Sequence, residues 1–130
     1  LPPNLSAPAL DATGSGRWER LAWWLCEGAG SDAALLMDPH GLLMASVGAL
    51  RLVDEENLGA RLMAALDQAA HMVPAGGPPP VVSVALPKSQ LTGFVVQAPD
   101  GHALTVGLLG RDHVPTTLCF LLRSLAEKAL

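Results

Sequence analysis

The sequence predicts an α/β (α+β) domain in which one β-sheet is covered on both faces by helices. Apolar periodicity gives the order helix, two strands, helix, three strands, helix. The expected strands are apolar on both faces, whereas an antiparallel sheet with one wet face would alternate apolar and polar residues. Three helices are available, so two on one face and one on the other is the natural arrangement.

The length of 130 residues fits one folded domain. Residues 1–16 are rich in Pro, Ala, Ser and Gly and show no periodicity, so we expect a flexible N-terminal segment that buries little apolar surface. The folded domain is expected to span residues 17–130.

The first helix is predicted over residues 17–27, where apolar residues recur at helical spacing, and Gly28 should end it. Two strands are expected next, over 33–37 and 42–47. Between them, Asp38-Pro39-His40-Gly41 has the composition of a type I turn.

The middle helix is predicted over residues 55–72, with Asp54 as its N-cap. Its core stripe comprises Leu58, Leu62, Ala65, Leu66 and Ala69. A second row, made of Gly59, Met63 and Ala70, is small and apolar. A helix with one face in water normally carries more charge than this one. We therefore expect the second row to be buried within the domain or to meet another molecule.

Three strands are expected over residues 81–86, 91–98 and 102–109, and Asp100-Gly101 favours a two-residue hairpin turn between the last two. Glycines in these strands, such as Gly93 and Gly107, would let a helix approach the sheet closely. Pro115 suits the first position of a final helix that runs to the end of the chain.

The composition narrows the class of ligand. Only 15% of the residues are charged, against about 25% in typical globular domains, so part of the surface is expected to be covered by a partner. The net charge is −4 and the basic residues are scattered, which argues against nucleic acid. No apolar run reaches the roughly 20 residues needed to cross a membrane. Cys26 and Cys119 fit buried, reduced thiols of a cytoplasmic protein.

The sequence offers no recognisable reaction centre. The four histidines are not at metal-ligand spacing, and Gly14-Ser15-Gly16 lacks the Lys-Ser/Thr ending of a phosphate loop. Asp112-His113 is the only adjacent acid–base pair, and capping of the following helix explains the aspartate. We therefore predict no catalytic, metal or cofactor site, and no enzyme activity of the chain itself.

Three stretches resemble the roadblock (dynein light chain) family: AALLMDPHGLLMASVG, NLGARLMAALDQAAHM and GFVVQAPDGHALTVGLLG. The resemblance runs from Arg17 to Leu130. It implies a five-stranded antiparallel sheet, with the first and last helices on one face and the middle helix on the other, a layout that profilin-like and longin-like folds largely share. It also implies homodimers, and association with Ras-like small GTPases or motor complexes; bacterial members include the activating partner of a cell-polarity GTPase. The Trp23-Trp24 pair and the Pro-rich loop 73–80 depart from the family pattern.

The resemblance and the uncharged surfaces together predict the interfaces. The strand over 81–86 carries no charge and no internal proline. An exposed edge strand usually carries a lysine or a proline that prevents pairing with another chain, unless it is already paired. The expected dimer interface comprises Gly59, Met63, Ala70, Val81, Ser83 and Ala85. Trp23 and Trp24 are candidate contacts to a second partner, because tryptophan is enriched at interface hot spots; alternatively, they close the core.

The sequence thus predicts a non-enzymatic dimeric regulator or scaffold that binds a Ras-like small GTPase in the cytoplasm. Any effect on GTP hydrolysis would come from ordering the switch segments of the GTPase. An arginine finger from Arg51 or Arg111, both in predicted loops, is the alternative, although surface arginines are usually just solvated. Two alternatives stay open. One is a small-ligand sensor with a pocket between sheet and helix, and the other is a purely structural dimerisation module of a larger complex.

Overall fold

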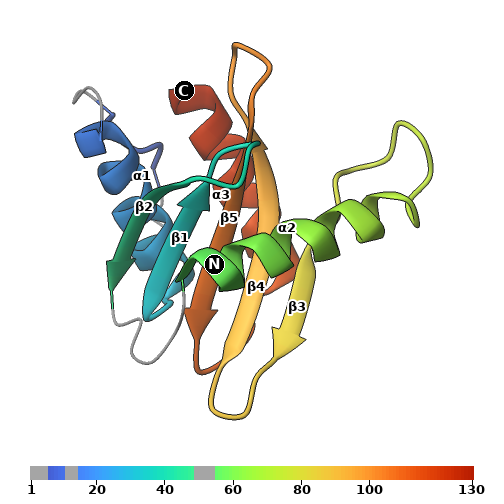
Figure 1. Cartoon of the computed structure of the whole chain (residues 1–130). Helices are drawn as coiled ribbons and strands as arrows, with labels where there is room; N and C mark the ends of the chain where they lie inside the picture. Colours follow the sequence, from blue (N-terminus) through green and yellow to red (C-terminus); the bar gives the residue numbers. More distant parts are fainter. Residues whose placement is uncertain (1–5, 11–14, 49–54) are drawn as a thin grey trace.

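A computed structural model describes residues 6–10, 15–48 and 55–130 of the chain. Its elements are α1 (Ser15–Ala29), β1 (Ala33–Met37), β2 (Leu43–Gly48), α2 (Glu55–Ala70), β3 (Val82–Ala85), β4 (Gln90–Gln97), β5 (Ala103–Gly110) and α3 (Thr116–Ala129). The strands form one antiparallel sheet in the order β2-β1-β5-β4-β3. Helix α2 crosses one face, and α1 and α3 lie on the other (Figure 1). The predicted fold class is confirmed.

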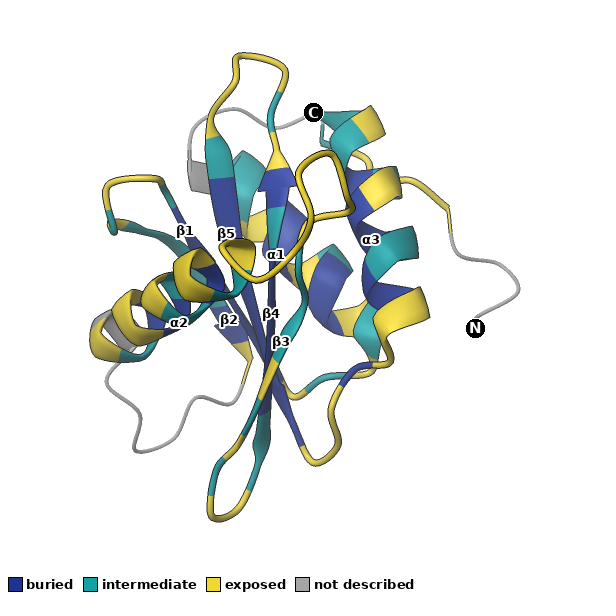
Figure 2. Ribbon diagram, turned by 90° about the vertical axis from the view of Figure 1, so that its right-hand side faces the viewer, coloured by how far each residue is buried: buried dark blue, intermediate teal, exposed yellow. Residues whose placement is uncertain are grey.

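Both faces of the sheet are buried, as the apolar strands predicted. Every residue of β1 is buried, and most of β4 and β5 is as well (Figure 2). A large core cluster packs β1, β4 and β5 against α1 and α3. A smaller cluster under α2 comprises Ala33, Leu62, Leu66, Leu91 and Leu109. One face of the sheet therefore carries the large cluster under α1 and α3. The other face, called the thin side below, carries the small cluster, and α2 is the helix that covers it (Figure 1).

Glycines allow α2 to lie close to the sheet. A Cβ atom at Gly93 would overlap the side chain of Leu62, and one at Gly107 would come within 3.0 Å of it. This confirms that these strand glycines permit a close approach. Gly59 does the same from the helix side, since it is buried over Met37. Of the two alternatives left open for the second row of α2, burial within the domain therefore holds for Gly59, because its missing side chain makes room for β1.

The two hairpins β1–β2 and β4–β5 turn at the same end of the sheet (Figure 1). Each closes with three residues, because the N–H of Asp38 donates to the carbonyl of Leu42 (2.9 Å) and that of Ala98 to the carbonyl of His102 (2.9 Å). The predicted two-residue turn at Asp100-Gly101 is therefore wrong. Pro99 fits the second position of a type I turn, and Gly101 (φ 89°) supplies the left-handed residue that follows.

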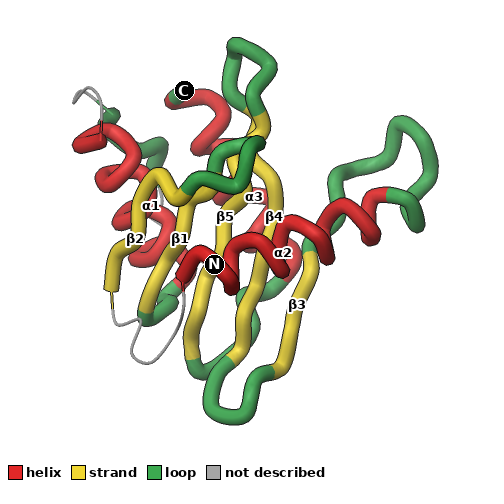
Figure 3. Tube along the Cα trace, viewed as in Figure 1, coloured by secondary structure: helices red, strands yellow, loops and turns green. Residues whose placement is uncertain are grey.

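Helix boundaries shift by a few residues from those expected. Helix α1 continues through Gly28 to Ala29, and α2 ends at Ala70. Pro115 is the N-cap of α3 rather than its first helical residue, since its ψ of 141° is extended. Asp54, the expected N-cap of α2, lies outside the described residues. The segment after α2 forms a long loop that projects past β3 before it returns to that strand (Figure 3).

Part of the N-terminal segment packs on the domain. Pro8 is buried, and Leu10 packs against the large core cluster. The indole Nε1–H of Trp24 donates to the carbonyl of Ser6 (2.9 Å). Pro8 and Leu10 of the expected flexible segment thus contact the folded domain, and the flexibility of residues 1–16 stays a prediction. Residues 1–5 and 11–14 lie outside the described residues, and the domain start at residue 17 stays a prediction.

Candidate functional site

The thin side of the sheet carries an open apolar hollow. Helix α2 crosses this face obliquely (Figure 1) and leaves a space of about 470 Å³ between α2, β4, β5 and the loop before β3. Its lining comprises Pro39, Met63, Leu66, Asp67, Ala70, Pro79, Pro80, Val95, Gln97, Ala103 and Thr105. Met63 is half-buried and Ala70 is exposed. Two residues of the expected interface row thus border uncovered apolar surface.

The edge strand β3 directly follows Pro79 and Pro80, which line this hollow, and Val81. Among the residues that the structure describes, β3 pairs only with β4. Val82 and Val84 pack against the small cluster under α2, whereas Ser83 and Ala85 are exposed on the alternate side. Val81 precedes the strand and packs against the large cluster. The structure therefore places the expected contacts Val81, Ser83 and Ala85 on the opposite side of the sheet from Met63 and Ala70.

Several residues of the hollow were missed by sequence reasoning. Val95 and Ala103 come from β4 and β5, and Pro80 comes from the loop before β3. The alternation of Val82 and Val84 along the edge strand marks the side of β3 that faces the helix, but neither residue lines the hollow, so it did not reveal the missed residues. The residues from β4, β5 and the loop become neighbours of α2 only when the chain folds.

Trp23 and Trp24 differ sharply in exposure. Trp23 is 44% exposed on the outer side of α1, whereas Trp24 is half-buried and hydrogen-bonded to Ser6. Adjacent helix positions point about 100° apart, so the pair cannot present one flat aromatic surface. Of the two expected partner contacts, Trp23 alone is an exposed side chain.

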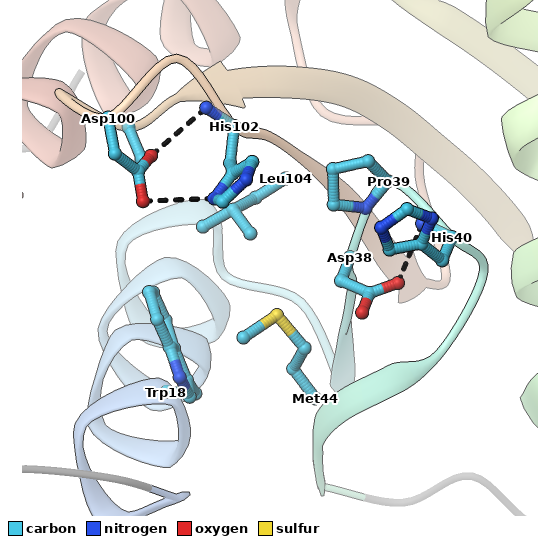
Figure 4. A pocket seen from close by; sticks show the side chains of 9 residues that line it. Trp18, Asp38, Pro39, His40, Met44, Asp100, His102 and Leu104 are labelled. Atoms are coloured by element: carbon cyan, nitrogen blue, oxygen red, sulfur yellow. Dashed lines mark hydrogen bonds and ion pairs between the residues drawn. The ribbon is translucent and has the colours of Figure 1, made fainter.

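The two hairpin turns enclose a second, smaller cavity of about 200 Å³ (Figure 4). Trp18, Met44 and Leu104 give it apolar walls, and Asp38 and Asp100 approach it from the turns. Ligand pockets usually have volumes of about 300–1,000 Å³. The cavity is therefore small for a metabolite.

The two aspartates of this cavity act first within their own turns. Asp38 Oδ1 accepts the N–H groups of His40 (2.8 Å) and Leu42 (2.9 Å). Asp100 Oδ1 accepts the N–H of His102 (3.0 Å), and its Oδ2 lies 2.9 Å from His102 Nδ1. The backbone hydrogen bond from His102 lowers the pKa of Asp100. These hydrogen bonds give each aspartate a structural role within its own turn.

The thiols are unsuited to nucleophilic chemistry. Cys26 and Cys119 are both buried and unpaired. Burial raises the pKa of Cys26, and it raises the pKa of Cys119 to about 11. A thiol rather than a thiolate is therefore present at neutral pH, and the thiolate is the reactive form.

Searches for metal and membrane features cover the described residues alone. Over 6–10, 15–48 and 55–130, no three His, Cys, Asp or Glu side chains gather in a way that could hold a metal ion. Within the same ranges, no helix has both the length and the apolar character to span a bilayer.

This chain is similar to known proteins in its three-dimensional structure rather than in its sequence. No protein-family model matches the sequence, and no curated protein matches it either. A solved structure described as MglB with tetrameric arrangement is similar with a TM-score of 0.63 at 18% identity, over 96% of this chain and 98% of that chain. MglB of Myxococcus xanthus gives 0.59 at 20% identity, over 93% and 90%. A roadblock/LC7 domain from Streptomyces avermitilis gives 0.57 at 22% identity, over 85% and 92%. The chain therefore has the roadblock fold, as the resemblance in its sequence predicted.

Proposed function

We propose that this chain is a non-enzymatic, cytoplasmic regulator or scaffold that works as a homodimer and binds a Ras-like small GTPase. The observation that carries the proposal is the apolar hollow beside α2, which Met63 and Ala70 border, together with the uncharged edge strand β3. Uncovered apolar surface of this kind marks a protein–protein contact. The similar MglB structure with a tetrameric arrangement supports assembly into oligomers.

A two-fold pairing of two chains accounts for the hollow. In a symmetric dimer the same patch meets itself, so the α2 helix of each protomer would cover the uncovered strands of the other. Exposed alanines on α2, such as Ala60, Ala64 and Ala70, would let two helices approach closely. The backbone of β3 would remain at the rim, where edge pairing satisfies its N–H and C=O groups.

The GTPase would bind outside this dimer contact. Helix α1 and helix α2 lie on opposite faces of the sheet (Figure 1), so Trp23 stays accessible when the α2 face is covered. The resemblance to roadblock proteins supports a Ras-like GTPase as the partner. The thiols are buried and their pKa values are raised, so they would take no part in catalysis. The chain would change hydrolysis by ordering the partner's switch segments, or by an arginine finger from the exposed loop residue Arg111; Arg51 lies outside the described residues.

The proposal is tested by two measurements on the full chain. Light scattering at tens of micromolar should give twice the chain mass, and a monomer would contradict the dimer. Small GTPases of the same host, loaded with GTP or with GDP, should include one that binds with a preference for one nucleotide state. If none binds, the scaffold serves another protein.

A small-ligand sensor is the second candidate, because the hollow of about 470 Å³ has the volume of a ligand pocket. Its lining is apolar apart from a few polar groups, among them Asp67 and Gln97. A thermal-shift screen against nucleotides and metabolites separates the two functions. A ligand that raises the melting temperature of the dimer and depends on Gln97 would favour the sensor.

A further inference from the structure

The segment Ser6–Leu10 lies on the domain as an extended strap. Its burial alternates from Ala7 onward, since Ala7 and Ala9 are exposed, Pro8 is buried and Leu10 is half-buried. Such alternation is typical of an extended backbone whose every second side chain faces a surface. We use the name strap for these five residues. Pro8 and Leu10 are its inward side chains.

The strap is held in part through its backbone. The Nε1–H of Trp24 donates to the carbonyl oxygen of Ser6, two residues before Pro8. Leu10 packs against the same large cluster that Trp24 borders. Aromatic-lined grooves recognise proline-containing extended segments in this way, because such segments are stiff and keep their carbonyls free to accept hydrogen bonds.

The features that hold the strap are not special to this chain. A backbone carbonyl is present in any segment, and the remaining determinants are one proline and one aliphatic side chain two residues later. No residue from Leu1 to Leu10 is charged. The segment that contacts Trp24 is thus uncharged and proline-containing, with alternating burial typical of an extended backbone.

We propose that the surface of α1 around Trp24 is a docking groove for an extended, uncharged, proline-containing segment of a partner protein, and that the strap occupies this groove in cis and closes it. The strap itself shows which chemistry the groove accepts. The inference stands apart from the proposed function, because it concerns Trp24 and the strap rather than the α2 face or the exposed Trp23.

Exchange of the strap for a partner segment is physically reasonable. One hydrogen bond and two inward side chains are opposed by the conformational entropy of ordering five residues, so the docked state is only marginally favoured. Displacement would also leave Trp24 more exposed beside Trp23, and a competing segment would cover it again. The strap thus competes with a partner segment for the same surface. Because it belongs to the same chain, its effective concentration at that surface is on the order of millimolar.

The test uses the full chain and a fluorescein-labelled peptide with the sequence of residues 1–10. A strap variant, Pro8→Gly with Leu10→Ser, removes the inward side chains of the strap and leaves the groove unchanged. The peptide should bind this variant about tenfold more tightly than the wild-type chain, because apparent affinity scales with the fraction of open groove. Equal binding by the two chains, or no binding by a folded strap variant, would overturn the proposal.

Matched peptides and a groove variant locate the contact. A peptide with Ala9→Ser, an exposed position, should bind as well as the original, whereas a peptide with Pro8→Gly and Leu10→Ser should not bind. Trp24→Phe in the strap variant removes the indole donor and should weaken peptide binding about tenfold. Unchanged binding in Trp24→Phe would place the peptide elsewhere and refute the groove. If the strap variant does not fold, NMR order parameters decide. Trp24→Phe in the otherwise wild-type chain should lower the backbone order parameters of Ala7 and Ala9, and unchanged order parameters there would refute the proposal.

Discussion

Gly59 in α2 lies directly over Met37 in β1, so closely that a Cβ atom on Gly59 would stand 2.6 Å from the Met37 sulfur. Met37 is fully buried and has little room to move away. Glycine within a helix costs about 1 kcal/mol relative to alanine. The contact explains why α2 nevertheless carries glycine here, since a Cβ atom would force the buried Met37 side chain to shift.

Gly59→Ala should destabilise the fold by about 1–3 kcal/mol, because overpacking outweighs the gain in helix propensity. Urea unfolding at constant slope measures the change. Met37→Val in the same chain should recover part of the loss by making space, and Met37→Val alone is the control. A Gly59→Ala chain that is more stable than the wild type would show that α2 can lift off β1 at no cost.

Met63→Glu should dissociate the proposed dimer, because it places a charge in an apolar contact. Gln68→Glu is the matched control: it adds the same charge to α2 at an exposed position that does not line the hollow. Light scattering over a concentration series should show a monomer for the first variant and a dimer for the second. If both variants stay dimeric, the dimer forms through another surface.

Trp23→Ala should weaken GTPase binding about tenfold or more if this side chain is an anchor of the interface. The change should cost little stability, because Trp23 is 44% exposed. Leu42→Ala, which shortens another exposed apolar side chain at 66% exposure, is the control and should bind normally. Titration by calorimetry measures both affinities. Equal losses in the two variants would indicate a general surface effect.

Cys119 should be unreactive in the folded chain, because burial raises its pKa to about 11. At pH 8 only about one thiol in a thousand would be ionised, and the thiolate is the form that reacts. Ellman's reagent should therefore label both cysteines slowly without denaturant and at once in urea. Cys119→Ala assigns the remaining reaction to Cys26. Rapid labelling of the native chain would mean that α3 opens easily.

Asp100 should stabilise the β4–β5 hairpin above its unfolded pKa of 3.8 and lose this effect in acid. The sign follows because the folded pKa is lowered by the N–H of His102, so the ionised form is favoured in the folded state. Asp100→Asn should lower the melting temperature at pH 5–7. The difference from wild type should shrink as the pH falls through the lowered pKa. Asp112→Asn removes an exposed loop carboxylate and is the control for charge loss.

Local patterns were sufficient to predict the elements and their order. Apolar periodicity located the three helices and five strands, and the runs of apolar residues in β1 and β5 predicted a sheet buried on both faces. The turn residues located both hairpins, although the loop of β4–β5 is one residue longer than predicted because Pro99 belongs to it. Each of these signals lies within a few residues of the feature that it predicts.

Non-local packing decided the candidate sites. Helix periodicity placed Gly59 beside Met63, but only the approach of β1 shows that one is buried and the other borders the hollow. Composition predicted a free N-terminal segment, yet Ser6 is held by Trp24, which is 18 residues away. The sequence by itself thus determined the secondary structure, the sheet buried on both faces and the roadblock resemblance. The tertiary structure alone decided which apolar residues stay uncovered, because their burial depends on neighbours that are distant along the chain.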